Sequence, residues 1–148
     1  MPETSNHRRS EVTAGILNLV AGAGHVGVTA DHFAEWVGYG LFFLAAATGQ
    51  VVLGLALLTR AINPTDSGPK WRTLQQWMYA TGAIGNAVII VMYIVTRTVG
   101  IPWVGPAQGE VEAPAVYDVV VTLAEVVAVF LLVLLWRSAR RALRPVGV

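Results

Sequence analysis

Four apolar stretches dominate this sequence, and each is close to the length that crosses a bilayer. A transmembrane helix needs about 20 consecutive apolar residues. The stretches cover residues 12–30, 37–59, 74–96 and 115–136. Of the 148 side chains, 55% are hydrophobic and only 13% are charged, so the composition agrees with these runs. We therefore expect one domain over residues 1–148, an all-α integral membrane up-down four-helix bundle.

Basic residues gather on one side of the predicted spans. Nine of the ten lysines and arginines precede the first span, follow the fourth, or lie between the second and third. The positive-inside rule makes that side cytoplasmic, so we expect a multi-pass plasma-membrane protein with both termini in the cytoplasm. Orientation and anionic lipid headgroups explain these charges, and no nucleic-acid partner is needed. Arg8 and Arg9 before an apolar run imitate a signal peptide, but cleavage would put the termini on opposite sides, so we expect the first span to be kept.

Residues 97–114 connect the third and fourth spans on the predicted outer side. Three glycines and three prolines in this segment exclude a regular helix. Ile101, Trp103 and Val104 make it too apolar to extend into water. We expect the segment to fold over the outer end of the bundle, either as a constrained connector or as part of a site.

Polar side chains recur at helical spacing in the first and fourth spans. A helix returns to nearly the same face every seven residues, after a rise of about 10 Å. Asn18, His25 and His32 follow this spacing in the first span, and Asp118 and Glu125 follow it in the fourth. At matching depths, His32 would face Asp118 and His25 would face Glu125.

The second and third spans bring further polar groups. Gln50 lies three turns from Tyr39 on one face of the second span, and Tyr79, Asn86 and Tyr93 repeat every seven residues in the third. Lipid cannot solvate such groups, so we expect them to point into the bundle. The predicted supporting network consists of Asn18, Gln50, Asn86, Tyr93, Arg97, Glu110 and Glu112.

Histidines combined with carboxylates form a ligand set for divalent metals. Imidazole and carboxylate suit Zn, Fe, Mn or Cu(II), and His32-x-x-Glu35 places two donors on one helical turn. The absence of cysteine excludes thiolate ligands and disulfides. From the sequence we favour an outward-facing intramembrane site that binds a divalent transition metal through His25, His32, Glu35, Asp118 and Glu125.

A second reading makes the protein a handler of protons or cations. In this reading His25 and Glu125 exchange protons with the outer carboxylates. No charged residue is expected to continue the stripe to the inner face, which argues against a complete channel.

Two more readings stay open. The polar groups could form a purely structural network in a homo-oligomer or in an accessory subunit of a larger membrane complex. Alternatively, a pocket between Tyr93, Trp103 and His32 could bind a quinone or a lipid in a redox protein. A bis-histidine haem is disfavoured because both intramembrane histidines lie on the first span.

Three runs of the sequence carry a resemblance to known proteins, namely DHFAEWVGYGLFFLAAATGQ, TRTVGIPWVGPAQGEVE and YDVVVTLAE. They resemble a group of small four-span integral membrane proteins of actinobacteria whose function is unassigned. The group shows a similar His…His-x-x-Glu-Trp…Gln run, a Gly- and Pro-rich outer loop after an arginine, and an Asp…Glu pair in the last span. The resemblance covers most of the chain and implies the same architecture, but no activity. This chain departs from the group at Trp103-Val104, where the group more often has a shorter Pro-x-Gly-Pro.

Overall fold

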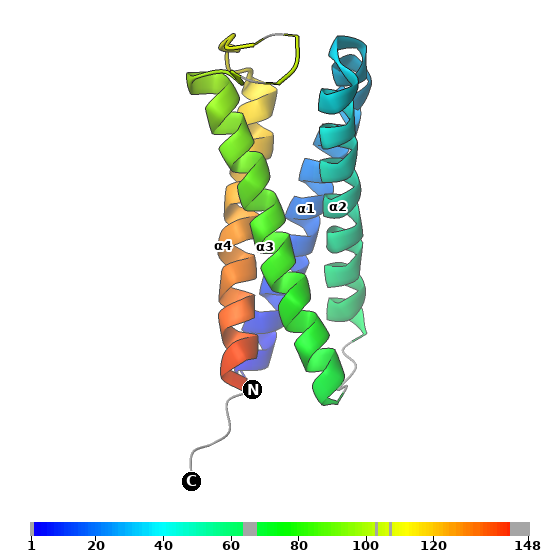
Figure 1. The fold of residues 1–148 in the computed structure, drawn as a ribbon. Coiled ribbons are helices and arrows are strands. Elements are labelled where there is room, and N and C mark those ends of the chain that lie inside the picture. The colour runs from blue at the N-terminus through cyan, green and yellow to red at the C-terminus, as the bar shows by residue number, and fades with distance from the viewer. Residues whose placement is uncertain (1, 64–67, 103, 107, 143–148) are drawn as a thin grey trace.

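The protein is a bundle of four antiparallel helices. The computed structural model describes residues 2–63, 68–102, 104–106 and 108–142. Consecutive helices run in opposite directions, so α1 begins and α4 ends at the same end of the bundle (Figure 1). We call this the terminal end, and we call the end that carries residues 99–115 the loop end. The helices are α1 (Pro2–Glu35), α2 (Val37–Ile62), α3 (Pro69–Thr98) and α4 (Val116–Ala142).

The all-α four-helix bundle expected from the sequence is confirmed. All four helices are long and apolar enough to cross a membrane. All four extend beyond the apolar run that predicted them, α1 and α3 at both ends and α2 and α4 at their C-terminal ends, and α1 is the longest at 34 residues. Pro2 suits the first turn of a helix, and no glycine or proline interrupts residues 3–14, so the polar start of the chain continues the helix. Only Trp36, with an extended backbone, separates α1 from α2.

The packing is tight between α1 and α2 and loose between α2 and α3. Glycines let the first pair approach closely, because a Cβ added to Gly54 would lie 2.8 Å from the Gly15 carbonyl oxygen. Among the packed helix pairs, α2 and α3 contact each other least. The hydrophobic core, which includes the fully buried Leu57, Tyr79 and Leu132, lies toward the terminal end. The bundle is therefore closed along α1 and α2 and more open between α2 and α3.

The outward faces of the helices are hydrophobic. Val52, Ile84 and Phe130, from three different helices, are each more than 60% exposed. Large apolar surfaces of this kind are rare on soluble monomers and match the acyl chains of a bilayer.

Candidate functional site

A chain of hydrogen bonds crosses the middle of the bundle and uses side chains from all four helices. Asn86 of α3 donates from Nδ2 to Oδ1 of Asn18 on α1, at 3.0 Å. Gln50 of α2 donates from Nε2 to Asn86 Oδ1 at 3.1 Å and to Oε1 of Glu125 on α4 at 2.7 Å. Nε2 of His25 lies 2.9 Å from the same Glu125 oxygen. All five side chains are buried, so these bonds offset much of the cost of removing them from water.

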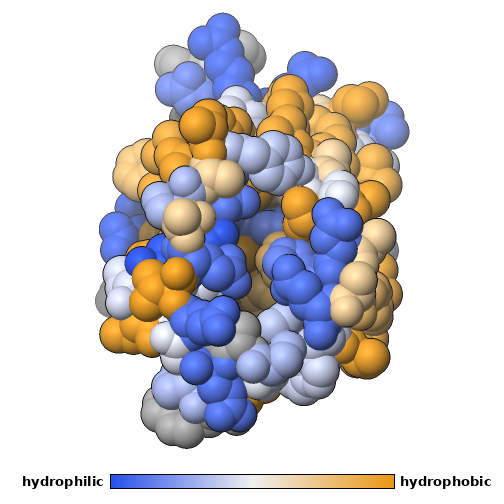
Figure 2. Space-filling view, turned by 90° about the horizontal axis from the view of Figure 1, so that it is seen from above, coloured by the Kyte–Doolittle hydropathy of each residue, from blue (hydrophilic) through white to orange (hydrophobic). Residues whose placement is uncertain are grey.

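A cavity of about 590 Å³ lies between this chain and the loop end. Figure 2 views the molecule from the loop end and shows a hollow with hydrophilic side chains around its opening. The volume falls within the roughly 300–1,000 Å³ of small-molecule sites. All four helices line the cavity, and the 99–115 segment contributes Ile101, Pro102, Val104 and Glu112.

Aromatic rings form much of the cavity wall. The ring of His32 stacks on Phe43 with 3.9 Å between the centroids, and His25 meets Phe43 edge to face at 5.4 Å. Trp36 and Tyr39 form a second edge-to-face pair, at 5.1 Å. Aromatic rings have a negative face and a positive edge, so a planar ligand can stack on these rings or meet them edge to face.

Arg97 carries the positive charge of the cavity. Its terminal nitrogens donate to Asp118 Oδ2 at 2.7 Å and to Glu112 Oε2. The guanidinium carbon lies 5.1 Å from the centre of the Tyr93 ring. The Nε–H of Arg97 is buried and has no hydrogen-bond partner within the described part of the chain. Because one cation lies between two carboxylates, the group is formally negative and still holds an unused donor.

The 99–115 segment is attached to two helices. Tyr39 of α2 donates its hydroxyl to the Val104 carbonyl oxygen at 3.2 Å, and the Glu112 N–H donates to the Thr96 carbonyl oxygen at 3.1 Å. Gly105 has a φ of +89°, and a Cβ there would lie 2.2 Å from the Tyr39 hydroxyl oxygen. Only glycine combines this backbone conformation with such a close approach.

The five predicted metal ligands form pairs and do not converge on one point. His25 is bonded to Glu125, and His32 Nδ1 lies 3.1 Å from Glu35 Oε2. Asp118 binds an arginine, so it does not form the expected layer with His32. All of them except Glu35 line the cavity. Among the described residues, no group of three or more His, Asp or Glu side chains could hold a metal ion.

The predicted supporting network divides between the two levels of the site. Asn18, Gln50 and Asn86 belong to the mid-bundle chain, whereas Tyr93, Arg97 and Glu112 line the cavity. Glu110 is exposed on the 99–115 segment. Of the side chains predicted to form a quinone pocket, Tyr93 and His32 line the cavity, and Trp103 lies outside the described residues.

A second buried polar cluster, at the terminal end, was not predicted. The Glu11 carboxylate accepts hydrogen bonds from Arg60 Nε, at 2.7 Å, and from the Tyr79 hydroxyl. His7 Nε2 lies 3.7 Å from the same carboxylate, and Gln75 Nε2 donates to the Tyr79 hydroxyl at 2.6 Å. Glu11 is only 4% exposed. We call these five residues the terminal cluster.

Helical spacing contained a signal for the terminal cluster. Glu11 precedes Asn18 by seven residues, and Tyr79 precedes Asn86 by seven, so both continue the stripes of the mid-bundle chain. The expectation that no charged residue extends the stripe beyond His25 and Glu125 is therefore wrong. It failed because the polar start of the chain, which continues α1, had been placed outside the spans.

The chain matches no known protein family, no curated protein and no solved structure. The resemblance to the actinobacterial group therefore stays a prediction, and a function has to be argued from the geometry of the site.

Proposed function

We propose that this protein spans the plasma membrane four times and binds a neutral, membrane-soluble ring compound with oxygen substituents, of the quinone type, in the loop-end cavity. The observation that carries this proposal is a cavity of about 590 Å³ whose walls are rich in aromatic rings. Arg97 is one of its lining residues, and the buried Nε–H of Arg97 has no hydrogen-bond partner among the described residues. The proposal concerns binding; the protein would act as a carrier or as an accessory subunit that holds the compound.

The unused donor points to an oxygen acceptor on the ligand. A buried N–H without a partner costs about 1–3 kcal/mol. The Nε atom of Arg97 has almost no accessible surface, so the side chain would have to turn toward the cavity before a ligand carbonyl or hydroxyl oxygen could accept from this N–H and recover that cost. A head group of this kind also suits the ring-lined wall, where His32 and Phe43 are already stacked.

The charges favour a neutral head group over an anionic one. Arg97 is already balanced by Asp118 and Glu112, and Glu125 adds a further carboxyl to the lining. A phosphate or carboxylate on the ligand would meet a formally negative site, which repels it.

The proposed orientation puts the terminal end in the cytoplasm and the cavity at the outer surface. Lysines and arginines dominate the terminal end, whereas Arg97 is the single lysine or arginine near the loop end. The chain has no cysteine, so Asn63→Cys and Gln108→Cys introduce unique labelling sites at opposite ends. Intact cells should label Gln108→Cys and exclude the impermeant reagent from Asn63→Cys. Labelling of both would contradict the four-span topology.

Ligand binding can be tested with a tailless ring, 2-methyl-1,4-naphthoquinone, followed by quenching of tryptophan fluorescence, since Trp36 lines the cavity. Arg97→Lys keeps the charge but removes the Nε–H, and the affinity should fall by about tenfold for one lost hydrogen bond to a charged group. Arg60→Lys, in the terminal cluster, is the matched control and should leave the affinity unchanged. Absence of saturable quenching in the wild type would end the proposal, and displacement of the ring by phosphatidylglycerol would indicate an anionic-lipid site instead.

A divalent metal site is the second candidate, because four of the five predicted ligands line the same cavity. Binding would need His32 or Asp118 to leave its present partner and join His25 and Glu125. Elemental analysis of protein purified without chelators tests this candidate. Near-stoichiometric metal that is lost in His25→Ala and Glu125→Ala would support it, and metal-free wild type would reject it.

A further inference from the structure

A groove of about 280 Å³ runs along the side of the bundle between α2 and α3. Its walls carry small residues, and Ala45, Gly49 and Gly85 are exposed. A Cβ added to Gly49 or Gly85 would have no neighbour within 4 Å, so space is open on both walls. Because this side of the bundle faces lipid in the proposed orientation, the groove opens into the bilayer.

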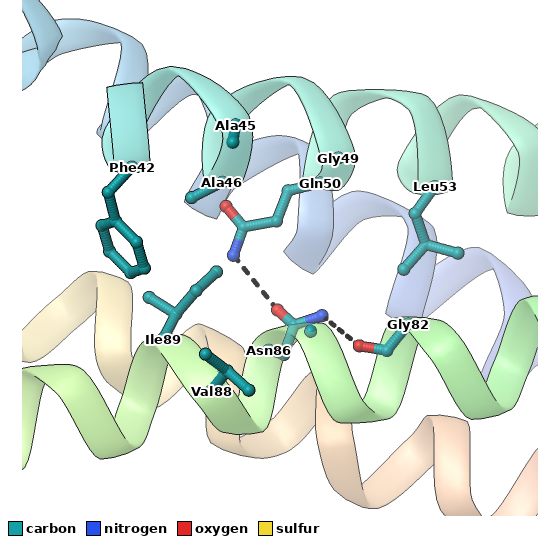
Figure 3. Close-up of a pocket in the computed structure, with 11 residues that line it drawn as sticks. Phe42, Ala45, Ala46, Gly49, Gln50, Leu53, Gly82, Asn86, Val88 and Ile89 are labelled. Carbon is teal, nitrogen blue, oxygen red and sulfur yellow. Dashed lines mark hydrogen bonds between the residues drawn. The ribbon is translucent and has the colours of Figure 1, made fainter. Parts of the chain in front are cut away.

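The groove adjoins the loop-end cavity. Phe42 of α2 and Ile89 of α3 line both spaces, so these two side chains separate them. Figure 3 shows Phe42 and Ile89 at one end of the groove and Leu53 and Gly82 at the other. Rotation of the Phe42 ring, with no movement of the backbone, would change the width of the passage between the groove and the cavity.

Gln50 supplies a polar group that fits a ligand and is left unused. Its amide nitrogen bonds both Asn86 and Glu125, so its two hydrogens are occupied and its orientation is determined. Its carbonyl oxygen has no hydrogen-bond partner among the described residues, although Gln50 is only 3% exposed. In Figure 3 this oxygen is turned toward Ala46, on the wall of the groove. The oxygen itself has almost no accessible surface, so an occupant reaches it only when the groove wall around Gln50 moves. A buried acceptor without a partner in this position favours an occupant with an O–H or N–H donor.

We propose that the α2–α3 groove is the lateral entrance to the cavity, and that the molecule entering is a hydroxyl-bearing ring compound with an aliphatic tail, whose hydroxyl donates to Gln50. This inference rests on the proposed function, because it names the form of the same ligand and its route. A phenolic hydroxyl is both donor and acceptor, so one type of head group satisfies Gln50 at the entrance and Arg97 in the cavity. The tail lies in the groove among the alanine and glycine walls, where it contacts lipid.

The entrance can be closed without touching the cavity. Ala45→Phe fills the groove from α2, and Gly85→Leu fills it from α3 if the first variant fails to fold. Leu44→Phe is the matched control. Leu44 precedes Ala45 in the chain and is 46% exposed, but it does not line the groove. The probes are 2-methyl-1,4-naphthohydroquinone without a tail and the same hydroquinone with a four-isoprene tail, both kept reduced under anaerobic conditions and supplied from lipid nanodiscs.

The inference predicts that Ala45→Phe slows association of the tailed compound by at least about tenfold while the tailless ring binds within about twofold of wild type. Leu44→Phe should change neither. Equal association of the tailed compound in all variants would overturn the lateral entrance and leave the proposed function intact. Loss of both compounds in Ala45→Phe at an unchanged melting temperature would also overturn it, since the groove would then not be separable from the cavity. Failure of both compounds to bind the wild type would instead reject the proposed function.

The role of Gln50 has its own test, made under anaerobic conditions. The tailed hydroquinone should bind about tenfold more tightly than its dimethyl ether, which lacks the O–H donor. This preference is a ratio within one protein, so it should disappear in Gln50→Leu even if that variant binds both compounds more weakly. Equal binding of the two compounds by the wild type, or a preference that persists in Gln50→Leu, would overturn the assignment of Gln50 as the acceptor.

Discussion

The two ends of the bundle bring together the same four residue types, a histidine, a glutamate, a tyrosine and an arginine, in different arrangements. At the terminal end, His7, Arg60 and Tyr79 all approach the single carboxylate of Glu11. At the loop end, the His25–Glu125 pair and the group around Arg97 both line a cavity. The first arrangement uses its donors on one acceptor, whereas the second leaves a donor unused. We infer that the terminal cluster serves stability and the loop end serves binding.

The largest expected effect comes from changing the two glutamates. Glu11→Gln should lower the free energy of unfolding by about 3 kcal/mol, the low end for breaking a buried ion pair, because Arg60 keeps its charge and is partly exposed. Glu125→Gln should cost less than about 1 kcal/mol, because glutamine still accepts from Gln50 and the histidine partner can be neutral. Chemical unfolding in detergent, followed by circular dichroism, measures both. Equal losses would remove the distinction between the two ends.

Tyr79 at the terminal end and Tyr93 at the loop end provide a second comparison of the two ends. Tyr79→Phe removes a hydroxyl that donates to Glu11 and accepts from Gln75, so we expect a loss of about 2 kcal/mol. Tyr93→Phe should have a smaller effect on unfolding and a larger one on ring binding, because Tyr93 lines the cavity. The opposite ranking, from the same unfolding and quenching measurements, would reverse the roles assigned to the two ends.

A substitution in the 99–115 segment, which lines the cavity at the loop end, tests whether the segment needs a glycine at position 105. Gly105→Ala places a side chain at a positive φ and against the Tyr39 hydroxyl, so we expect a cost of about 1–2 kcal/mol, taken up locally. Proteolysis of the folded protein between residues 99 and 115 should become faster. An unchanged cleavage rate would mean that the segment is not held by the Tyr39 contact.

The smallest expected effect has the opposite sign. Gly49→Ala puts a methyl group into open space inside a helix, and alanine is favoured there over glycine by about 0.5–1 kcal/mol. The melting temperature should rise slightly. A fall would show that the groove wall is already in contact with something at this position, such as a bound lipid.

The fold was predictable because its main determinant is local. Each apolar run is long enough to define one helix, and only the ends differ, since polar residues such as those before residue 12 can still be helical. The His25–Glu125 pair followed from equal depth in two helices. The partner of Asp118 did not, because Arg97 and Glu112 come from the end of α3 and the connecting segment, whose path is set by contacts with other helices.

The cavity and the groove could not be predicted from the sequence, for a related reason. Both depend on how far α2 and α3 lie apart, and helical spacing reports only which side chains share a face, not the distance to the next helix. Gln50 illustrates the limit. Its inward orientation was expected. That its nitrogen has two partners, and its oxygen none among the described residues, depends on where two other helices, α3 and α4, place Asn86 and Glu125.

The amide side chains at mid-bundle have a consequence for assembly. Hydrophobic helices can slide along one another in lipid at little cost, since one apolar contact resembles the next. A slip of one residue would turn Asn18, Gln50 or Asn86 by about 100° away from its partners and leave buried amides unpaired. These three residues therefore fix the register of the helices relative to one another, and in the proposed membrane orientation they would also set the depth at which each end of the bundle meets the membrane surface.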